Sequence, residues 1–167
     1  SASRASFPAA RDGPAIETAA TPEPLHFTLR DLERGTAMLA NLIGSLGLPP
    51  DSRIAVQVEK SVEALMLYLA VLRAGHVYLP LNSAYQAAEI EYFIGNAEPA
   101  VVVCAPADFG WVSRIAFLAG TKHVYTLGSD RTGTLLDRAA FQPDAHEPAV
   151  RAAGDLAAIL YTSGTTG

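Results

Sequence analysis

The sequence has few residues that could cross-link it or bind a metal. It contains 1 Cys and 4 His among 167 residues. With Cys104 alone, neither a disulfide nor a thiolate cluster can form within the chain, which suits a reducing, cytoplasmic environment. The histidines, His26, His76, His123 and His146, are scattered, and none stands at helical spacing from another metal ligand, so we expect no metal site. Cys104 has no basic neighbour, and we expect it to pack in the core rather than act as a nucleophile.

Basic residues and long apolar runs are also scarce. The chain has 12 Lys and Arg against 17 Asp and Glu, a formal net charge of -5, and no basic run, so we expect no nucleic-acid partner. Its longest apolar stretch, ALMLYLAVL at 64–72, is far shorter than the roughly 20 residues that cross a bilayer, so we expect no membrane span. The opening SASRASFPAARDG lacks the apolar centre of a secretory signal, and we expect residues 1–13 to be poorly ordered.

What the sequence does contain is a regular alternation of strand and helix patterns. Thr28, with Asp31 three residues later, predicts the start of a helix that ends near Gly47. Before this helix, two short strands are expected at 15–18 and 24–29, on either side of a turn at 21–24. The other predicted elements are strands at 54–58, 77–81, 100–104, 123–127 and 156–161, and helices at 61–73, 87–97, 108–119 and 134–140.

This alternation predicts the fold class. Strands separated by helices form an α/β fold with an open, mostly parallel sheet and helices on both faces, here over residues 14–167. Ligands of such sheets bind beyond the carboxyl ends of the strands. The stretch that follows the last predicted strand is therefore the first place to look for a site.

That stretch is YTSGTTG, the last seven residues. Gly164 and Gly167 allow the backbone amides to turn toward an anion, and no bulky side chain keeps the backbone away from phosphate oxygens. Four hydroxyl side chains stand beside them: Thr162, Ser163, Thr165 and Thr166. The stretch lacks the lysine of a P-loop. Composition leaves two interpretations open, a phosphate-binding loop and a flexible tail rich in serine and glycine.

Several stretches of the sequence carry a resemblance to a known family. YTSGTTG, with AAIL and Asp155 before it, resembles the phosphate-binding signature of the adenylate-forming acyl-CoA synthetases. HFTLRDLERGTAMLA and RAGHVYLPLNSAYQAAEIEYFIGNAEPAVVVC resemble two further family motifs. EKSVEALMLYLAVLRAG and YLPLNSAY look most like malonyl-CoA synthetases. The resemblance spans 14–167 and implies the N-terminal subdomain of the adenylate-forming enzyme fold.

The resemblance implies an acid–CoA ligase that works in two half-reactions. ATP and a carboxylate give an acyl adenylate and pyrophosphate, and the thiol of CoA then displaces AMP; Mg²⁺ accompanies ATP. By the same resemblance, the β- and γ-phosphates of ATP bind to Thr162, Ser163, Gly164, Thr165, Thr166 and Gly167, with Thr162 at the flank. Malonate is the favoured acid, and other short-chain, medium-chain and aromatic acids stay open.

The family also has parts that this sequence does not contain. The family motif continues into Pro-Lys-Gly, whereas the sequence stops at Gly167. The adenine and carboxylate pockets, the residue that positions Mg²⁺ and the catalytic lysine are expected in the remainder of the polypeptide. We therefore predict a fragment with no catalytic residue of its own, inactive by itself and prone to self-association through exposed apolar surface.

Two other functions are compatible with the fold class. The chain could be a catalytically silent module that binds nucleotide phosphates or another partner, and micromolar binding of ATP by the chain alone would favour this interpretation. A hydrolase rests on fold class alone, because the stretch around Ser163 lacks the G-x-S-x-G pattern of a nucleophile elbow.

The remaining candidate residues have simpler structural interpretations. Glu59 and Lys60 follow a predicted strand, where ligands collect, but solvated turn residues are the simpler assignment. Glu89 and Glu91 are two apart on a helix and point in different directions, which does not suit a catalytic pair. We assign no role to Asn82 and Tyr85, in the loop after VYLPL. Three aromatic side chains are placed in or near the core: Tyr78, Tyr92 and Phe93.

Overall fold

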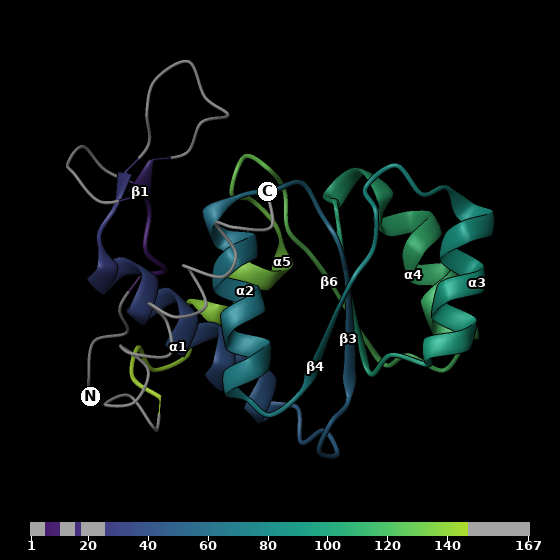
Figure 1. Ribbon diagram of the computed structural model, residues 1–167, viewed down its shortest axis with the longest axis horizontal. Coiled ribbons are helices and arrows are strands. Elements are labelled where there is room, and N and C mark those ends of the chain that lie inside the picture. The colour runs from purple at the N-terminus through teal and green to yellow at the C-terminus, as the bar shows by residue number, and fades with distance from the viewer. Residues whose placement is uncertain (1–5, 11–15, 18–25, 147–167) are drawn as a thin grey trace.

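The computed structural model describes residues 6–10, 16–17 and 26–146 (Figure 1). The predicted strand at 156–161 and the stretch YTSGTTG lie outside these residues. Two short strands, β1 (Ile16–Glu17) and β2 (His26–Phe27), pair antiparallel. All helices in the described ranges are too short or too polar to span a bilayer.

Helix α1 (Leu29–Ser45) begins where the sequence predicts it. The Asp31 amide donates to Thr28 Oγ1 at 3.0 Å, and the Thr28 amide donates to Asp31 Oδ2 at 3.1 Å. This reciprocal pair satisfies amide groups that a helix start otherwise leaves without partners. After the helix, Gly47 takes a φ of 64°, a left-handed conformation that glycine adopts without steric cost. The predicted start and end of this helix are confirmed.

Four parallel strands form the central sheet, in the order β4-β3-β5-β6. They are β3 (Arg53–Gln57), β4 (Val77–Pro80), β5 (Val101–Cys104) and β6 (His123–Thr126). Helices α2 (Val62–Arg73), α3 (Ala87–Ala97), α4 (Phe109–Leu118) and α5 (Thr134–Ala139) follow these strands in turn. A 3₁₀ turn at Pro106–Asp108 precedes α4, so the predicted start at Asp108 lies at this junction.

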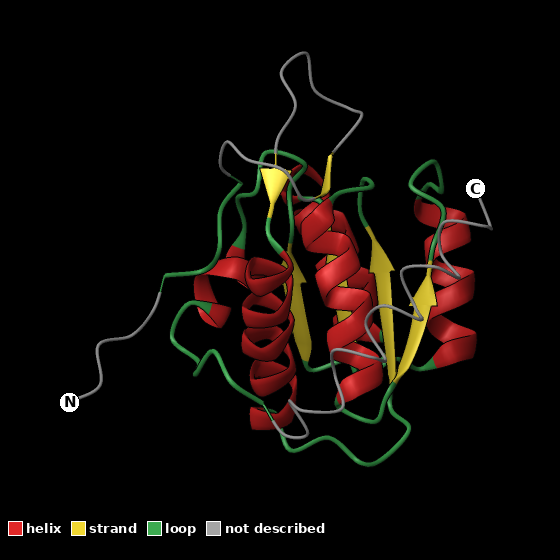
Figure 2. Ribbon diagram, turned by 60° about the vertical axis from the view of Figure 1, so that its left-hand side comes forward, coloured by secondary structure: helices red, strands yellow, loops and turns green. Residues whose placement is uncertain are grey.

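The helices form one layer on each face of the sheet, as Figures 1 and 2 show. Side chains of a strand alternate between its two faces. On β3, Ile54 and Val56 join the buried cluster under α1, α2 and α5, whereas Ala55 joins the cluster under α3 and α4. On β5, Val103 lies in the cluster under α1, α2 and α5, and Cys104 lies in the cluster under α3 and α4. The predicted open parallel sheet with helices on both faces is confirmed.

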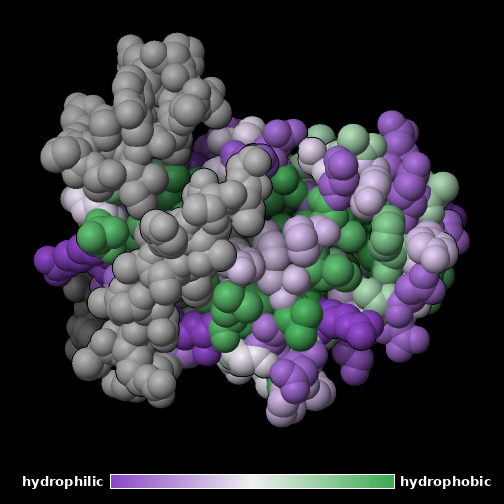
Figure 3. Space-filling view, in the orientation of Figure 1, coloured by the Kyte–Doolittle hydropathy of each residue, from purple (hydrophilic) through white to green (hydrophobic). Residues whose placement is uncertain are grey.

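Strand β4 is an edge of this sheet. Figure 3 shows apolar side chains between α2 and α3, where this edge lies, and Val77 is 43% exposed. Pro80 ends the strand, and because proline has no amide hydrogen it cannot donate to a further strand there. β4 is therefore a short edge strand, and Pro80 at its end disfavours pairing with a strand of another chain.

The connector after α5 returns to α1. Asn41 Nδ2 donates to the carbonyl oxygens of Pro143 and Ala145, each at 2.9 Å. Arg34 Nε lies 3.0 Å from Asp144 Oδ2. These contacts fix the last described residues of the chain against the first helix of the fold.

The winding of the chain reverses between β3 and β5. From β3 the chain continues into α2 on one face, and from the neighbouring β5 it continues into α4 on the other face. At such a reversal the two loops diverge and leave a crevice at the carboxyl ends of the strands. The topology thus marks one edge of the sheet as the ligand side.

Candidate functional site

The candidate site is the carboxyl edge of the sheet. Four loops meet the solvent there: 58–61 after β3, 81–86 after β4, 105–108 after β5 and 127–133 after β6. The six residues that the sequence predicts to bind phosphate, Thr162 to Gly167, lie outside the described residues. The described residues therefore show the strand ends and loops that form this edge, and the polar side chains that lie there.

Gln57, the last residue of β3, connects two of these loops. Its side chain is buried, and its Nε2 donates to the carbonyl oxygens of Asn82 and Tyr85, each at 3.0 Å. Carbonyl oxygens only accept, so both contacts must come from the NH₂ group of the amide. This orientation leaves Gln57 Oε1 buried and without a hydrogen-bond partner in the described part of the chain.

The loop after β4 is further stabilised by contacts of its own. The Ala84 amide donates to Asn82 Oδ1 at 2.8 Å, and the Tyr85 ring stacks on Phe93 with centroids 5.1 Å apart. The Gln86 amide donates to Glu89 Oε2 at 3.0 Å, which caps α3. Glu89 is therefore a capping residue. Hydrogen bonds from Gln57 and a hydrogen bond within the loop together hold this loop in one conformation.

The loop after β3 carries the charged residues considered from the sequence. Glu59 and Lys60 are exposed and follow Gln57 at the point where the winding reverses. The next residue, Ser61, caps α2, because its Oγ accepts from the Ala64 amide at 3.0 Å. The structure thus places both charged residues at the carboxyl edge, and neither side chain has a hydrogen-bond or ion-pair partner among the described residues.

Glu63, in the first turn of α2, is a buried carboxylate at this same edge. It is 3% exposed, and its Oε2 has no hydrogen-bond partner among the described residues. Burial raises the pKa of Glu63, while its own backbone amide and the charge of Arg131 partly oppose this rise. The turn after β6 brings Arg131 near it, and Arg131 has a φ of 65°. Sequence reasoning did not single out either residue.

Cys104, at the end of β5, is not a candidate nucleophile. Cys104 is fully buried, and burial raises the pKa of its thiol to about 12, with Asp108 adding to the rise. A thiol with this pKa is protonated at neutral pH and is a poor nucleophile. The prediction that Cys104 packs in the core is confirmed. In the turn after β6, Asp130 Oδ1 accepts from the amide and hydroxyl of Thr132, and these bonds lower the pKa of Asp130.

The predicted aromatic positions hold with one exception. Phe93 packs against the smaller buried cluster, and Tyr78 packs against the larger one in edge-to-face contact with Tyr68. Tyr92, however, is 65% exposed, so its prediction as a core or half-core residue is wrong. Its ring is in edge-to-face contact with Phe93, with the centroids 5.4 Å apart and the planes at 79°. At helical spacing Tyr92 lies on the outer side of α3, away from Ile90 and Ile94, which face the sheet.

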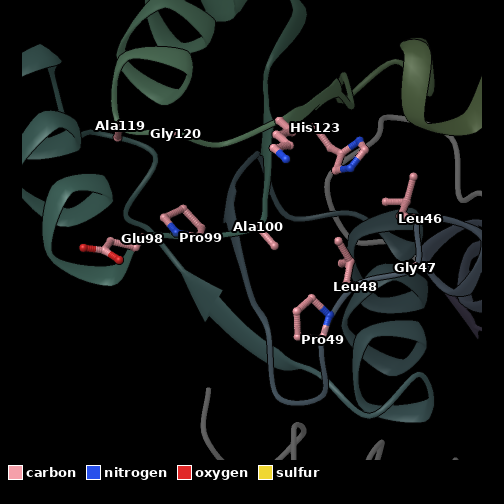
Figure 4. Close-up of a pocket in the computed structure, with 11 residues that line it drawn as sticks. Leu46, Gly47, Leu48, Pro49, Glu98, Pro99, Ala100, Ala119, Gly120 and His123 are labelled. Carbon is pink, nitrogen blue, oxygen red and sulfur yellow. The ribbon is translucent and has the colours of Figure 1, made fainter.

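A hollow of about 400 Å³ lies at the opposite, amino edge of the sheet (Figure 4). The carboxyl ends of α1, α3 and α4 border it, and Lys122 and His123 line it. Helix carboxyl ends carry partial negative charge, which disfavours the binding of phosphate there. His, Cys, Asp and Glu do not gather in groups of three or more anywhere in the described residues. We do not assign the ligand site to this hollow.

Sequence reasoning missed the role of Gln57. The signal was present, because IAVQV is an apolar run with one amide side chain near its end. What the run could not reveal is the partner, since Gln57 bonds to carbonyl groups 25 and 28 residues further along the chain.

Comparisons with known proteins agree with this architecture. The family model of the AMP-binding enzyme matches residues 8–167. The chain superposes on ATP-bound MatB from Rhodopseudomonas palustris with a TM-score of 0.72 and 46% identity, covering 79% of this chain and 25% of MatB. It is 35% identical over 144 residues to indigoidine synthase of Streptomyces lavendulae, covering 84% of this chain and 10% of that protein.

A further relative is bacitracin synthase 3 of Bacillus licheniformis, 30% identical over 151 residues, which cover 90% of this chain and 2% of that protein. The chain thus spans a quarter or less of the length of each of these relatives. The family model nevertheless extends over nearly all of the sequence, from residue 8 through the stretch YTSGTTG. The chain belongs to the AMP-binding enzyme family.

Proposed function

We propose that the chain is the amino-terminal portion, residues 14–167, of an ATP-dependent acid–CoA ligase with malonate as the favoured acid. The observation that carries this proposal is the 46% identity to ATP-bound MatB over 79% of the chain. This identity exceeds the 30% identity to bacitracin synthase 3 and the 35% identity to indigoidine synthase. The stretches EKSVEALMLYLAVLRAG and YLPLNSAY also resemble malonyl-CoA synthetases. Other short-chain, medium-chain or aromatic acids are the alternatives for the substrate.

The chemistry of such a ligase explains why the site needs phosphate binding. A carboxylate oxygen attacks the α-phosphorus of ATP, the bond to pyrophosphate breaks, and an acyl adenylate forms. The sulfur of CoA then attacks the acyl carbon, the bond to AMP breaks, and the thiol proton is released. Activation as a mixed anhydride supplies a leaving group that a carboxylate lacks. Mg²⁺ enters with ATP, and we assign no metal-dependent step to the described residues.

Within this proposal, Thr162 to Gly167 bind the β- and γ-phosphates of ATP. Support comes from the small residues and hydroxyl groups of the stretch, and from the family model, which runs through Gly167. The first turns of α2, α3 and α4 lie at the carboxyl edge of the sheet, where the partial positive charge of helix starts favours an anion. We assign no catalytic residue to this chain and propose that it works in the cytoplasm with the remainder of its polypeptide.

The test uses the full-length polypeptide and the chain alone. We expect the full-length protein to convert malonate, ATP and CoA to malonyl-CoA, AMP and pyrophosphate, and to prefer malonate over acetate, octanoate and benzoate. The chain alone is expected to show no turnover above a buffer blank. Malonate-independent or amino-acid-dependent pyrophosphate exchange by the full-length protein would overturn the assignment of the acid.

A second candidate is adenylation within a larger synthase. The observation in its favour is that the curated relatives include the synthases of bacitracin and indigoidine. Exchange of radiolabelled pyrophosphate into ATP in the presence of single amino acids distinguishes the two functions. A third possibility, a silent phosphate-binding module, predicts micromolar binding of ATP by the chain alone in calorimetry, whereas the ligase proposal predicts weak binding or none.

A further inference from the structure

We propose that Gln57 is a positioning residue that holds the loop after β4, residues 82–86, in a ligand-binding conformation at the carboxyl edge of the sheet. The inference rests on the proposed function, because it assigns a ligand contact to a loop at the edge where ligands bind. It adds a residue that neither the family match nor the predicted phosphate loop singles out.

The contacts that carry the inference are two hydrogen bonds from one amide group. Gln57 Nε2 reaches the carbonyl oxygens of Asn82 and Tyr85, each at 3.0 Å, so a single side chain holds both ends of the turn. The Tyr85 amide in turn donates to the Asn82 carbonyl at 3.0 Å. A turn held at both ends cannot shift as a unit unless these bonds break.

The choice of glutamine is not explained by packing. Gln57 is 5% exposed, and the three residues before it, Ile54 to Val56, are apolar and buried. An apolar side chain of the same length would fill this position without leaving Oε1 unsatisfied among the described residues, and a buried acceptor without a partner costs stability. The two hydrogen bonds that the Gln57 NH₂ group donates to the loop account for a polar residue at this position despite the cost in stability.

The position of Gln57 in the fold connects this loop to the reversal of the winding. Gln57 pairs in register with Cys104, the last residue of β5, so it stands at the point where the loops of β3 and β5 diverge. From there its Nε2 reaches the loop that follows the outer strand β4, at Asn82 and Tyr85. The residues at the tip of the loop are exposed and offer an amide, a hydroxyl and backbone groups to a ligand: Asn82, Ser83 and Ala84.

The first test measures the loop in the chain itself. In Gln57→Met, which keeps the length of the side chain and removes both donors, we expect amide hydrogen exchange at Ala84 and Tyr85 to accelerate about tenfold or more. Exchange within α1 should stay unchanged. The matched control is Gln142→Met, because the Gln142 side chain makes no hydrogen bond to the described residues. Equal loop exchange in the unchanged chain and in Gln57→Met would overturn the inference.

The second test measures the ligand contact in the full-length polypeptide. With ATP, malonate and CoA varied in turn, Gln57→Met should raise the KM for at least one of them about tenfold, while kcat per folded enzyme stays within about twofold. A merely structural role would lower the amount of folded enzyme and leave every KM unchanged, and that result overturns the inference. If Gln57→Met does not fold, Gln57→Asn replaces it, because the shorter amide keeps the polarity and loses the reach.

The two failures are distinguishable. Absence of turnover in the unchanged full-length protein overturns the proposed function and, with it, the ligand contact of the loop. Turnover by the unchanged protein, with every KM preserved in Gln57→Met, overturns only the positioning role.

Discussion

The two helical layers differ in how completely each encloses its share of the core. Under α1, α2 and α5, the side chains of Met38, Leu39 and Met66 are fully buried. Helices α1 and α2 approach so closely that a Cβ atom at Gly35 would lie 2.6 Å from Met66 Sδ. In the other layer, α3 and α4 leave large apolar side chains in solvent, among them Leu118 at 82% exposure.

This difference shows that the two faces of the sheet do not stabilise the chain equally. The layer of α1, α2 and α5 buries the larger cluster and also receives β2, the 143–145 connector and the Phe7 side chain. The layer of α3 and α4 buries a smaller cluster and borders the loop that Gln57 holds. The larger buried cluster therefore lies on one face of the sheet, and the loop that Gln57 holds borders the smaller cluster on the other face.

The largest expected effect is the loss of a buried leucine in the thicker layer. Leu39→Ala removes a side chain with no exposed surface, and we expect the free energy of unfolding to fall by about 3–5 kcal/mol, because a cavity remains in a close-packed core. Urea denaturation of the chain measures it. Leu29→Ala is the control, since Leu29 is 64% exposed on the same helix, and its change should stay within about 0.5 kcal/mol.

The same substitution in the thinner layer sharpens the comparison. Leu81 is buried at 8% exposure beside the edge strand β4, where the surroundings can close over a lost side chain. We expect Leu81→Ala to lower the free energy of unfolding by about 2 kcal/mol, at the low end of such changes. A loss equal to or greater than that of Leu39→Ala would contradict the unequal roles of the two layers.

The buried carboxylate of Glu63 predicts a pH dependence. Burial raises the pKa of Glu63 above its ordinary value of 4.5, so the folded chain binds the proton more readily than the unfolded chain. The stability from this group is therefore present at acidic pH and is lost as pH rises from that ordinary value through the folded pKa. Glu63→Gln should reduce the difference between urea midpoints at about pH 5 and about pH 8. Glu91→Gln, at an exposed site on α3, is expected to leave that difference unchanged.

The smallest effect on stability is expected at the exposed apolar surface of α4. Leu118→Ser should change the free energy of unfolding by no more than about 0.5 kcal/mol, yet reduce self-association of the chain, because it removes apolar surface from solvent contact. Sedimentation velocity at increasing concentration measures this. Leu29→Ser, on the thicker layer, provides the comparison: if it reduces association as much as Leu118→Ser, the α4 surface has no special part in it.

Much of the fold could be predicted from local patterns, and the site only in part. The Thr28–Asp31 capping pair, Gly47 and the valine run before Cys104 each depend on neighbours within a few residues, and their predicted elements agree with the structure. The exposure of Tyr92 could also have been predicted from a local pattern, because helical spacing places Tyr92 on the side of α3 opposite Ile90 and Ile94. The phosphate-binding role of Thr162 to Gly167 stays a prediction.

The sequence by itself determined the order of strands and helices in the described residues and the family to which the chain belongs, because these depend on spacing and motif. Only the tertiary structure decided the strand order β4-β3-β5-β6 and the unequal layers. It also brought Gln57 to the loop of Asn82 and Tyr85, which follow it 25 and 28 residues later. The physical reason is that strand neighbours and hydrogen-bond partners are chosen by packing across the sheet, and positions far apart along the chain meet only there.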